Sequence, residues 1–182
     1  MKKILIIVIG LVFCHSIMAQ KMITRSGEIK FEATMPGALE DIAATNNSVS
    51  CILDLSTGDF VALALVKAFK FKAPLMEEHF NENYIESSKF PKATFKGKIL
   101  NFDANKLSTA KTTFDLEGDL TMHGITKQIK TKISLAKNVE KINVVSNFSV
   151  KLKDYKIDIP SVVKNKITDN ANIKINFVLE AK

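Results

Sequence analysis

The chain has 182 residues and a formal net charge of +7; 46% of its residues are hydrophobic and 25% are charged. This length suits one domain with a sizeable core, and the composition argues against a disordered or membrane-spanning chain. There are 12 Phe but only 2 Tyr and no Trp, so almost every large ring lacks a polar group. Such a composition favours an apolar interior over a surface that stacks on sugars or bases.

The first residues predict an export signal. Two lysines precede an apolar run over 4–13, and a small residue stands directly before Gln20, which indicates cleavage at that point. The run is too short for a permanent membrane anchor, which needs about 20 residues. We therefore expect residues 1–19 to be a signal peptide. Residues 20–182 should form one periplasmic or secreted domain without a transmembrane anchor after cleavage.

Cleavage would leave Cys51 as the sole cysteine, so an intramolecular disulfide is excluded and a small buried side chain is expected there. The lysines are spread singly and alternate with apolar residues, as on the wet face of a sheet. No basic arm or aromatic stacking motif accompanies them, so no nucleic-acid partner is predicted. Stability should come from the apolar core.

Alternation of apolar and polar residues predicts that most of the chain is β-strand. In 114–122 the large apolar residues fall at even positions and the acids at odd ones, which places them on opposite faces of a strand. The expected strands lie at about 28–34, 48–55, 60–68, 92–102, 114–122, 129–135, 142–152 and 173–179, with turns at 56–59 and 103–106. Long consecutive strands joined by turns predict an all-β fold, an extended antiparallel up-and-down β-barrel of about eight strands, lipocalin-like.

One segment, near residues 74–86, departs from this pattern. Pro74 suits the first position of a helix, acids follow in the first turn, and apolar residues recur at spacings of four. We predict one short amphipathic helix that plugs or flanks an opening of the barrel.

The sequence carries no catalytic signature. It has no Gly-x-Ser-x-Gly elbow and no glycine-rich phosphate loop. The best set of metal ligands is His79, Glu82 and His123, but one pair three residues apart on a helix is a weak signal. We predict no enzyme activity, no metal and no cofactor.

Two stretches carry a family resemblance. With Phe-Pro-Lys-Ala-Thr-Phe-Lys-Gly-Lys-Ile over 90–99 and Gly-Asp-Leu-Thr-Met-His-Gly-Ile-Thr-Lys over 118–127, the sequence resembles the YceI-like family of exported lipid-binding proteins. The resemblance implies a barrel that encloses a tunnel for a polyisoprenoid chain, such as a quinone tail or a prenyl phosphate. The chain reads Arg25-Ser26 where the family usually has His-Ser. It reads Ala73-Pro74 where quinone-carrying members tend to have Arg-Asp. The resemblance therefore implies the apolar tunnel without a particular head group.

The predicted ligand-binding residues combine this resemblance with the alternation. We expect tunnel walls at Phe95, Phe114, Leu116, Leu120, Met122, Phe148, Val150, Ile175 and Phe177. Phe80 and Tyr84 should lie at the mouth, on the helix. His123 is the best polar candidate near an end, and its other expected role is a hydrogen bond to a neighbouring backbone carbonyl.

Two functions follow as hypotheses. The first is an exported binding protein that holds a long apolar lipid, of polyisoprenoid or isoprenoid quinone type, for transport, storage or sequestration. The sequence is compatible with either a monomer or a homodimer. The alternative is a non-catalytic structural or interaction protein of the cell envelope with a filled core. An internal void favours the first function and a filled interior favours the second.

Overall fold

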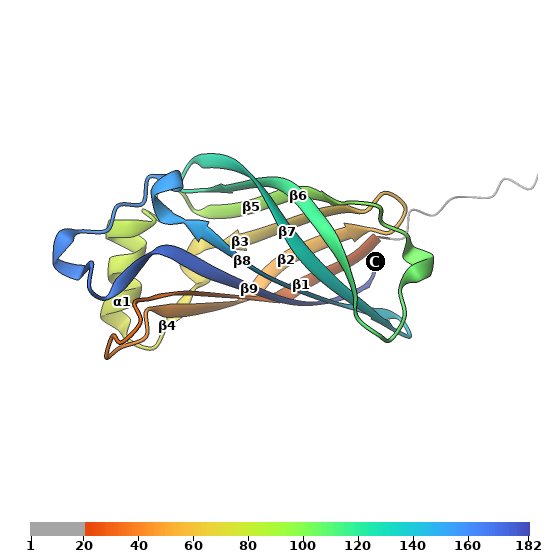
Figure 1. The fold of residues 1–182 in the computed structure, drawn as a ribbon, viewed down its shortest axis with the longest axis horizontal. Helices are drawn as coiled ribbons and strands as arrows, with labels where there is room; N and C mark the ends of the chain where they lie inside the picture. Colours follow the sequence, from red (N-terminus) through yellow and green to blue (C-terminus); the bar gives the residue numbers. More distant parts are fainter. Residues whose placement is uncertain (1–20) are drawn as a thin grey trace, which may run out of the picture.

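The computed structural model describes residues 21–182, which form a closed antiparallel β-barrel (Figure 1). The strands are β1 (Lys21–Thr34), β2 (Ala43–Asp54), β3 (Asp59–Leu65), β4 (Lys70–Phe71), β5 (Lys92–Ile99), β6 (Thr112–Met122), β7 (Ile125–Asn138), β8 (Lys141–Lys151) and β9 (Ile167–Ala181). All except β4 form a ring in chain order, which closes because β1 pairs with both β2 and β9. The predicted barrel is confirmed. The predicted signal peptide lies outside the described residues.

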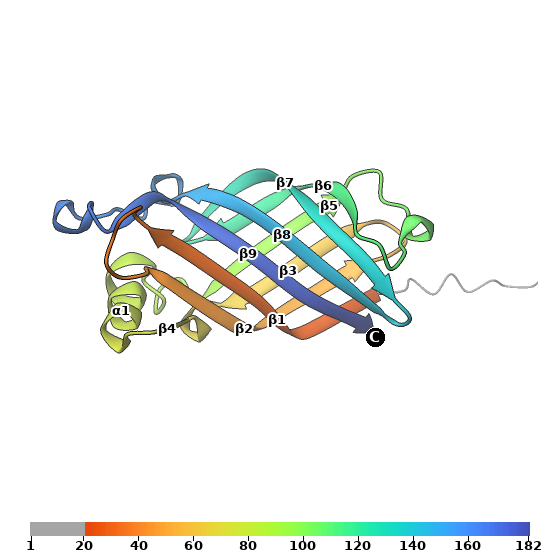
Figure 2. The same cartoon turned by 60° about the horizontal axis from the view of Figure 1, so that its bottom comes forward.

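Long strands give the barrel its elongated shape (Figures 1 and 2). The longest strand, β9, has 15 residues, and at ~3.3 Å per residue it spans about 50 Å. Tight turns join neighbours: β6 and β7 are linked through His123 and Gly124, whose φ values of 49° and 70° suit a two-residue hairpin. The turn predicted at 56–59 joins β2 to β3.

Several predicted strand limits differ from the structure. The strand expected over 60–68 ends at Leu65, because residues Val66–Ala68 form a 3₁₀ turn, η1. The first strand begins at Lys21, well before residue 28, and the short β4 was not predicted. β4 exists through pairing with β2, where Phe71 lies opposite Ala44.

The predicted helix is present at one end of the barrel. It consists of α1 (Pro74–His79), with Pro74 in the first turn, and a π-helical turn, η2 (Phe80–Tyr84). Within residues 21–182, no helix combines the length and the apolar character needed to cross a bilayer.

The two ends of the barrel differ (Figure 2). We call one the mouth end; it carries α1, the β1–β2 connection, the β6–β7 turn and the 3₁₀ turns η4 (Leu152–Tyr155) and η5 (Ser161–Val163). We call the other the packed end; it carries the β2–β3 turn, the 3₁₀ turn η3 (Ala104–Lys106), the β7–β8 turn and the C-terminus.

Candidate ligand-binding cavity

The mouth half of the barrel is hollow. It contains an apolar cavity of about 540 Å³ that opens at the mouth end beside α1 and is lined by residues of the strands, the helix and η5. Cavities of 300–1,000 Å³ with apolar walls are typical of small-molecule sites. The interior therefore contains the open space that distinguishes a binding barrel from a filled one.

Exposure along single strands shows where the hollow half ends. On β9 the inward side chains Ile173 and Ile175 are only half-buried, whereas Phe177 and Leu179, further toward the packed end, are fully buried. On β6 the order is reversed, because the strand runs the other way: Phe114 is buried and Met122 is half-buried. Half-buried side chains on an inward face border open space, so side chains fill the packed end whereas the mouth half contains the cavity.

Aromatic rings form the floor of the cavity. The rings of Phe60 and Phe95 line it, with centroids 6.2 Å apart, and Phe60 stacks on Phe177 with centroids 6.4 Å apart. Phe95 lies over two glycines that face each other across β5 and β6, since a Cβ on Gly97 or Gly118 would come within 2.6 or 2.7 Å of its Cζ atom. The glycines thus make room for the ring against the barrel wall.

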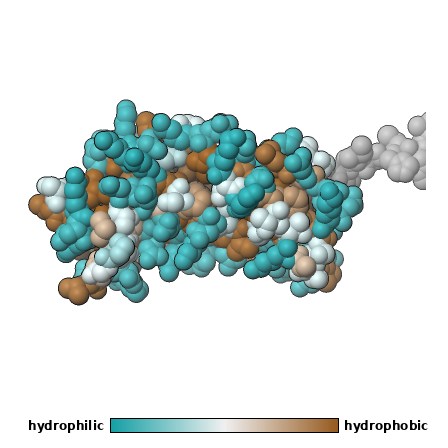
Figure 3. Space-filling model, viewed as in Figure 1, coloured by the Kyte–Doolittle hydropathy of each residue, from teal (hydrophilic) through white to brown (hydrophobic). Residues whose placement is uncertain are grey.

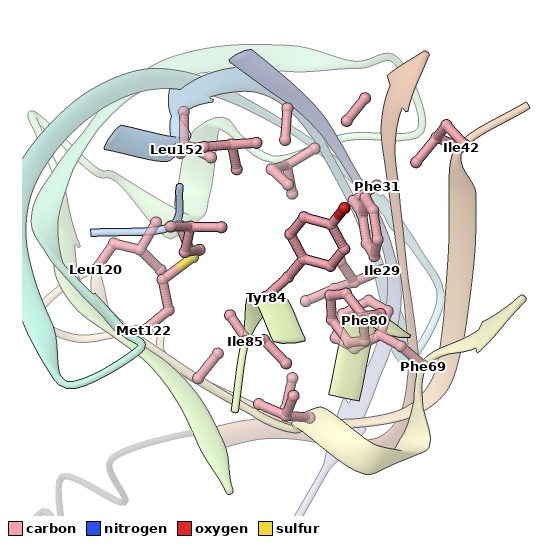
Figure 4. Close-up of a pocket in the computed structure, with 18 of the residues that line it drawn as sticks. Ile29, Phe31, Ile42, Phe69, Phe80, Tyr84, Ile85, Leu120, Met122 and Leu152 are labelled. Carbon is pink, nitrogen blue, oxygen red and sulfur yellow. The ribbon is translucent and has the colours of Figure 1, made fainter. Parts of the chain in front are cut away.

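A second aromatic group joins the helix to the barrel at the mouth. Phe80, in the π-helical turn, stacks on Phe31 with centroids 5.3 Å apart, and it contacts Phe71 at 5.1 Å and Phe69 at 6.1 Å. All four rings line the cavity, and Figure 4 shows Phe31, Phe69 and Phe80 beside one another at its wall. Aromatic pairs at these separations stabilise by about 0.5–1.5 kcal/mol each beyond simple burial. The helix is therefore fixed at the edge of the opening.

The polar residues that border the cavity gather mainly at the mouth. Glu40, His79 and Lys166 belong to the β1–β2 connection, α1 and the segment before β9, and all three are exposed. Tyr84 directs its ring into the cavity (Figure 4). Two threonines, Thr94 and Thr131, are the remaining polar lining residues among those described. This distribution suits a ligand with a long apolar part and a polar end at the opening.

His123 holds the mouth-end segments together. Its Nδ1 lies 2.8 Å from the carbonyl oxygen of Tyr155 and its Nε2 lies 3.0 Å from Oε2 of Glu86, while its ring packs edge-on against Phe90 with centroids 4.7 Å apart. Hydrogen bonds from Lys89 and from His123 hold the pKa of the Glu86 carboxyl below its usual range. The side chain links the β6–β7 turn to η4 and to the segment after the helix, which matches its expected role of bonding a backbone carbonyl.

The structure brings most of the predicted site residues to the cavity. Of the predicted ligand-binding residues, those that line the cavity are Phe80, Tyr84, Phe95, Leu116, Leu120, Met122, Phe148, Val150 and Ile175. Their contact with a ligand stays a prediction. Phe114, Phe177 and His123 lie elsewhere: Phe114 packs on Phe102 with centroids 5.7 Å apart, and Phe177 is fully buried behind Phe60. The expected tunnel is a cavity closed at one end, because large side chains fill the packed half.

Sequence reasoning missed several lining residues. Phe31, Phe69 and Phe71 were not singled out, although Phe69 and Phe71 alternate with Lys70 in the way that marks one face of a strand. Others, such as Ile157 and Val163, belong to irregular segments. Period-two patterns cannot identify inward positions there.

Among residues 21–182, few titratable side chains border the cavity, and they lie mainly at its mouth. Among the described residues, those that border it with an ionisable side chain are Glu40, His79, Tyr84 and Lys166. Within residues 21–182, no three His, Cys, Asp or Glu side chains are placed to hold a metal ion. Cys51 is buried in β2, and burial raises the pKa of its thiol, which is typical of an unreactive structural cysteine.

Comparisons with known proteins agree with this architecture. A family model described as YceI-like domain matches residues 18–179. No curated protein matches the chain.

Several solved structures share the fold. The polyisoprenoid-binding domain from Saccharophagus degradans superposes with a TM-score of 0.77 at 13% identity, over 90% of this chain and 99% of that one. Burkholderia cenocepacia BcnA gives 0.66 at 14% identity, over 83% and 95% of the two chains. The Campylobacter jejuni YceI protein gives 0.64 at 18% identity, over 80% and 88%.

Proposed function

The chain belongs to the YceI-like family, and on this premise we propose that it is an exported binding protein that holds one long apolar lipid in the barrel. The ligand would be a polyisoprenoid or the tail of an isoprenoid quinone, held for transport, storage or sequestration outside the cytoplasm. The observation that carries the proposal is the apolar cavity of about 540 Å³, open at the mouth end and closed by Phe60 and Phe95. The Saccharophagus degradans neighbour, described as a polyisoprenoid-binding domain, supports the ligand class.

The size of the cavity limits the ligand. The finite volume of about 540 Å³ sets an upper limit on the length of chain that the cavity encloses. Longer chains would have to extend past the mouth. The polar end would then lie near Tyr84, His79 and Lys166, where hydrogen-bonding groups are available.

The energetics allow useful affinity. Burying about 500 Å² of hydrocarbon stabilises a complex by roughly 12 kcal/mol before association costs. Those costs are an estimated 4–15 kcal/mol, so binding requires a cavity that already exists in the free protein. The fixed aromatic walls, such as the stacked pair Phe31 and Phe80, supply that condition. The alternative hypothesis, a structural protein with a filled core, does not account for this cavity.

The test is to identify the bound molecule directly. Protein purified without detergent should yield one apolar compound per chain when native mass spectrometry is followed by extraction with organic solvent. Extracted protein should then rebind prenols and quinones in a series of chain lengths. Empty protein that binds none of these compounds would overturn the proposal.

A matched pair of variants locates the site. Ala64 and Ala136 are 3% and 8% exposed, but only Ala64 lines the cavity; Ala136 lies near the end of β7, at the packed end. Ala64→Phe should place its ring in open space, keep the protein folded and exclude the longer prenols first. Ala136→Phe overfills a buried position away from the cavity and should lower the free energy of unfolding by about 1–3 kcal/mol without changing ligand length. Equal effects of the two changes on ligand length would contradict this position for the site.

A further inference from the structure

Aliphatic side chains project into solvent around the opening of the cavity. Leu39, Leu75 and Val162 are 103%, 60% and 82% exposed, and they belong to the β1–β2 connection, α1 and η5. Leu75 itself lines the cavity, and the other two are followed directly by lining residues, Glu40 and Val163. Three segments distant in sequence thus each present one apolar tip at the same opening. We call these three residues the apolar rim.

The position of the rim distinguishes it from ordinary surface leucines and valines. Among the described residues, large hydrophobic side chains that are more than half exposed are Leu39, Leu75, Val139 and Val162, and only Val139 belongs to the packed end. Figure 3 shows apolar surface protruding at the mouth end among hydrophilic atoms. Scattered exposed residues need no explanation, but a group beside an apolar cavity marks an interaction surface.

The charges beside the rim match the head groups of anionic lipids. Lys164 and Lys166 follow Val162, both are exposed, and residues 161–167 contain no acid. Across the mouth, the acids Asp41 and Glu77 are already in ion pairs with Lys72 and Lys70. Glu40, Glu78 and Glu82 remain there as exposed acids. On the Val162 side, residues 151–167 carry five exposed lysines against the two exposed acids Asp154 and Asp158, so positive charge is concentrated on that side.

We propose that the mouth end docks on the surface of a lipid bilayer. The apolar rim would enter the boundary between head groups and acyl chains, and Lys164 and Lys166 would contact anionic head groups. In this position the cavity opens directly into the apolar part of the membrane, so an apolar molecule passes between the two without crossing water. The inference goes beyond the proposed function, because docking does not require the cavity to be occupied.

The experiment measures sedimentation of the protein with vesicles of phosphatidylcholine, with and without phosphatidylglycerol. The wild type should bind both kinds of vesicle and should bind the anionic ones more tightly. Leu39→Asn and Val162→Asn should each lower the partition coefficient about tenfold, since one buried aliphatic side chain accounts for a change of this order. The double variant should lower it further. Asn removes apolar surface without adding charge.

The matched control is Val139→Asn at the packed end. Val139 is 85% exposed, close to the 82% of Val162, and its φ of 49° is one that Asn adopts readily. This variant should bind vesicles as the wild type does. Equal losses from Val139→Asn and Val162→Asn would overturn the proposal, as would a wild type that binds neither vesicle. A rim substitution that dissociates a dimer and leaves vesicle binding unchanged would assign the surface to a second copy instead, and would also overturn it.

Failure of this inference is distinguishable from failure of the lipid-binding proposal. Leu39 and Val162 do not line the cavity, so both Asn variants should retain the extractable lipid of the wild type. Vesicle binding with no ligand in any preparation would contradict lipid binding alone. Retained ligand with no vesicle binding would contradict docking alone.

Discussion

The hydroxyl of Tyr155 is buried and has no hydrogen-bond partner among the described residues. The side chain is 2% exposed, and burial, with the nearby Asp154 carboxylate, raises the pKa of Tyr155 to about 12. A buried hydroxyl that has lost water without gaining a partner destabilises the folded state. We predict that Tyr155→Phe leaves the free energy of unfolding unchanged or raises it by about 1 kcal/mol. Urea unfolding of the two proteins measures the difference.

Tyr84→Phe is the control for this substitution. Tyr84 is half-buried at the cavity, so removal of its hydroxyl should change the stability of the ligand-free protein little. If Tyr155→Phe instead lowers the free energy of unfolding by more than about 1 kcal/mol, the hydroxyl of Tyr155 has a partner that stabilises the fold.

For single residues, the sequence predicts whether a side chain faces the barrel interior better than it predicts what that side chain contacts there. Leu120 and Phe114 share the inward face of β6, as their even spacing indicates, yet Leu120 lines the cavity and Phe114 packs against Phe102. Spacing along one strand contains no information about the total volume of side chains that meet at that level of the barrel. The cavity therefore could not be located from alternation alone.

The facing glycines of β5 and β6 are essential to the barrel wall. A Cβ on Gly118 would lie 2.5 Å from the carbonyl oxygen of Lys96 and 2.7 Å from Cζ of Phe95. Because moving the backbone would disturb the pairing of β5 with β6, Gly118→Ala should displace the ring of Phe95. The change should lower the free energy of unfolding by about 1–3 kcal/mol. Urea unfolding gives the stability, and rebinding of prenols shows whether the displaced ring shortens the accepted chain.

Gly37→Ala is the contrasting change. No atom lies within 4 Å of the Cβ position at Gly37, but its φ of 85° belongs to the left-handed region, so only backbone strain of about 1 kcal/mol is expected. Prenol binding should stay as in the wild type. If the two alanine variants have the same effect on ligand length, the glycine pair does not position Phe95.

Among the elements, the β2–β3 turn and the helix could be predicted, whereas the start of β1 and the existence of β4 could not. The turn predicted at 103–106 lies within a longer connection from Ile99 to Thr112 that contains η3. The register of β1 shifts on both sides of Gly27 and interrupts the alternation, so the sequence pattern indicates a strand only from residue 28. Gly27 leaves room for the ring of Phe177, a contact between distant strands. β4 is two residues long and depends wholly on pairing with β2.

For the whole molecule, the division into a packed half and a hollow half predicts uneven protection of the backbone. In ligand-free protein, amides around the cavity, such as those of Ile173 and Ile175, should exchange with solvent faster than those of Phe177 and Leu179 on the same strand. A ligand stabilises the folded state by about 2.7 kcal/mol at a concentration of 100 times Kd. Loading with a prenol should therefore slow exchange mainly in the hollow half.

Hydrogen exchange followed by mass spectrometry, on extracted and reloaded protein, measures this difference. Uniform protection along β9 before and after loading would contradict it. The general barrel class could be predicted from the sequence because alternation and turns recur along the chain. The division into halves could not, because it depends on how rings such as Phe60, Phe95 and Phe177 meet across the interior.

The aromatic floor closes the cavity toward the packed end, and the cavity opens at the mouth end beside α1. A linear guest with one hydrophilic terminus must go in with its hydrocarbon terminus leading, and it must come out in the opposite order. The hydrophilic terminus thus stays outermost during residence. An acceptor that recognises this terminus could reach it while the hydrocarbon remains inside the barrel. Transfer of the bound molecule to the acceptor then does not require its prior release into water.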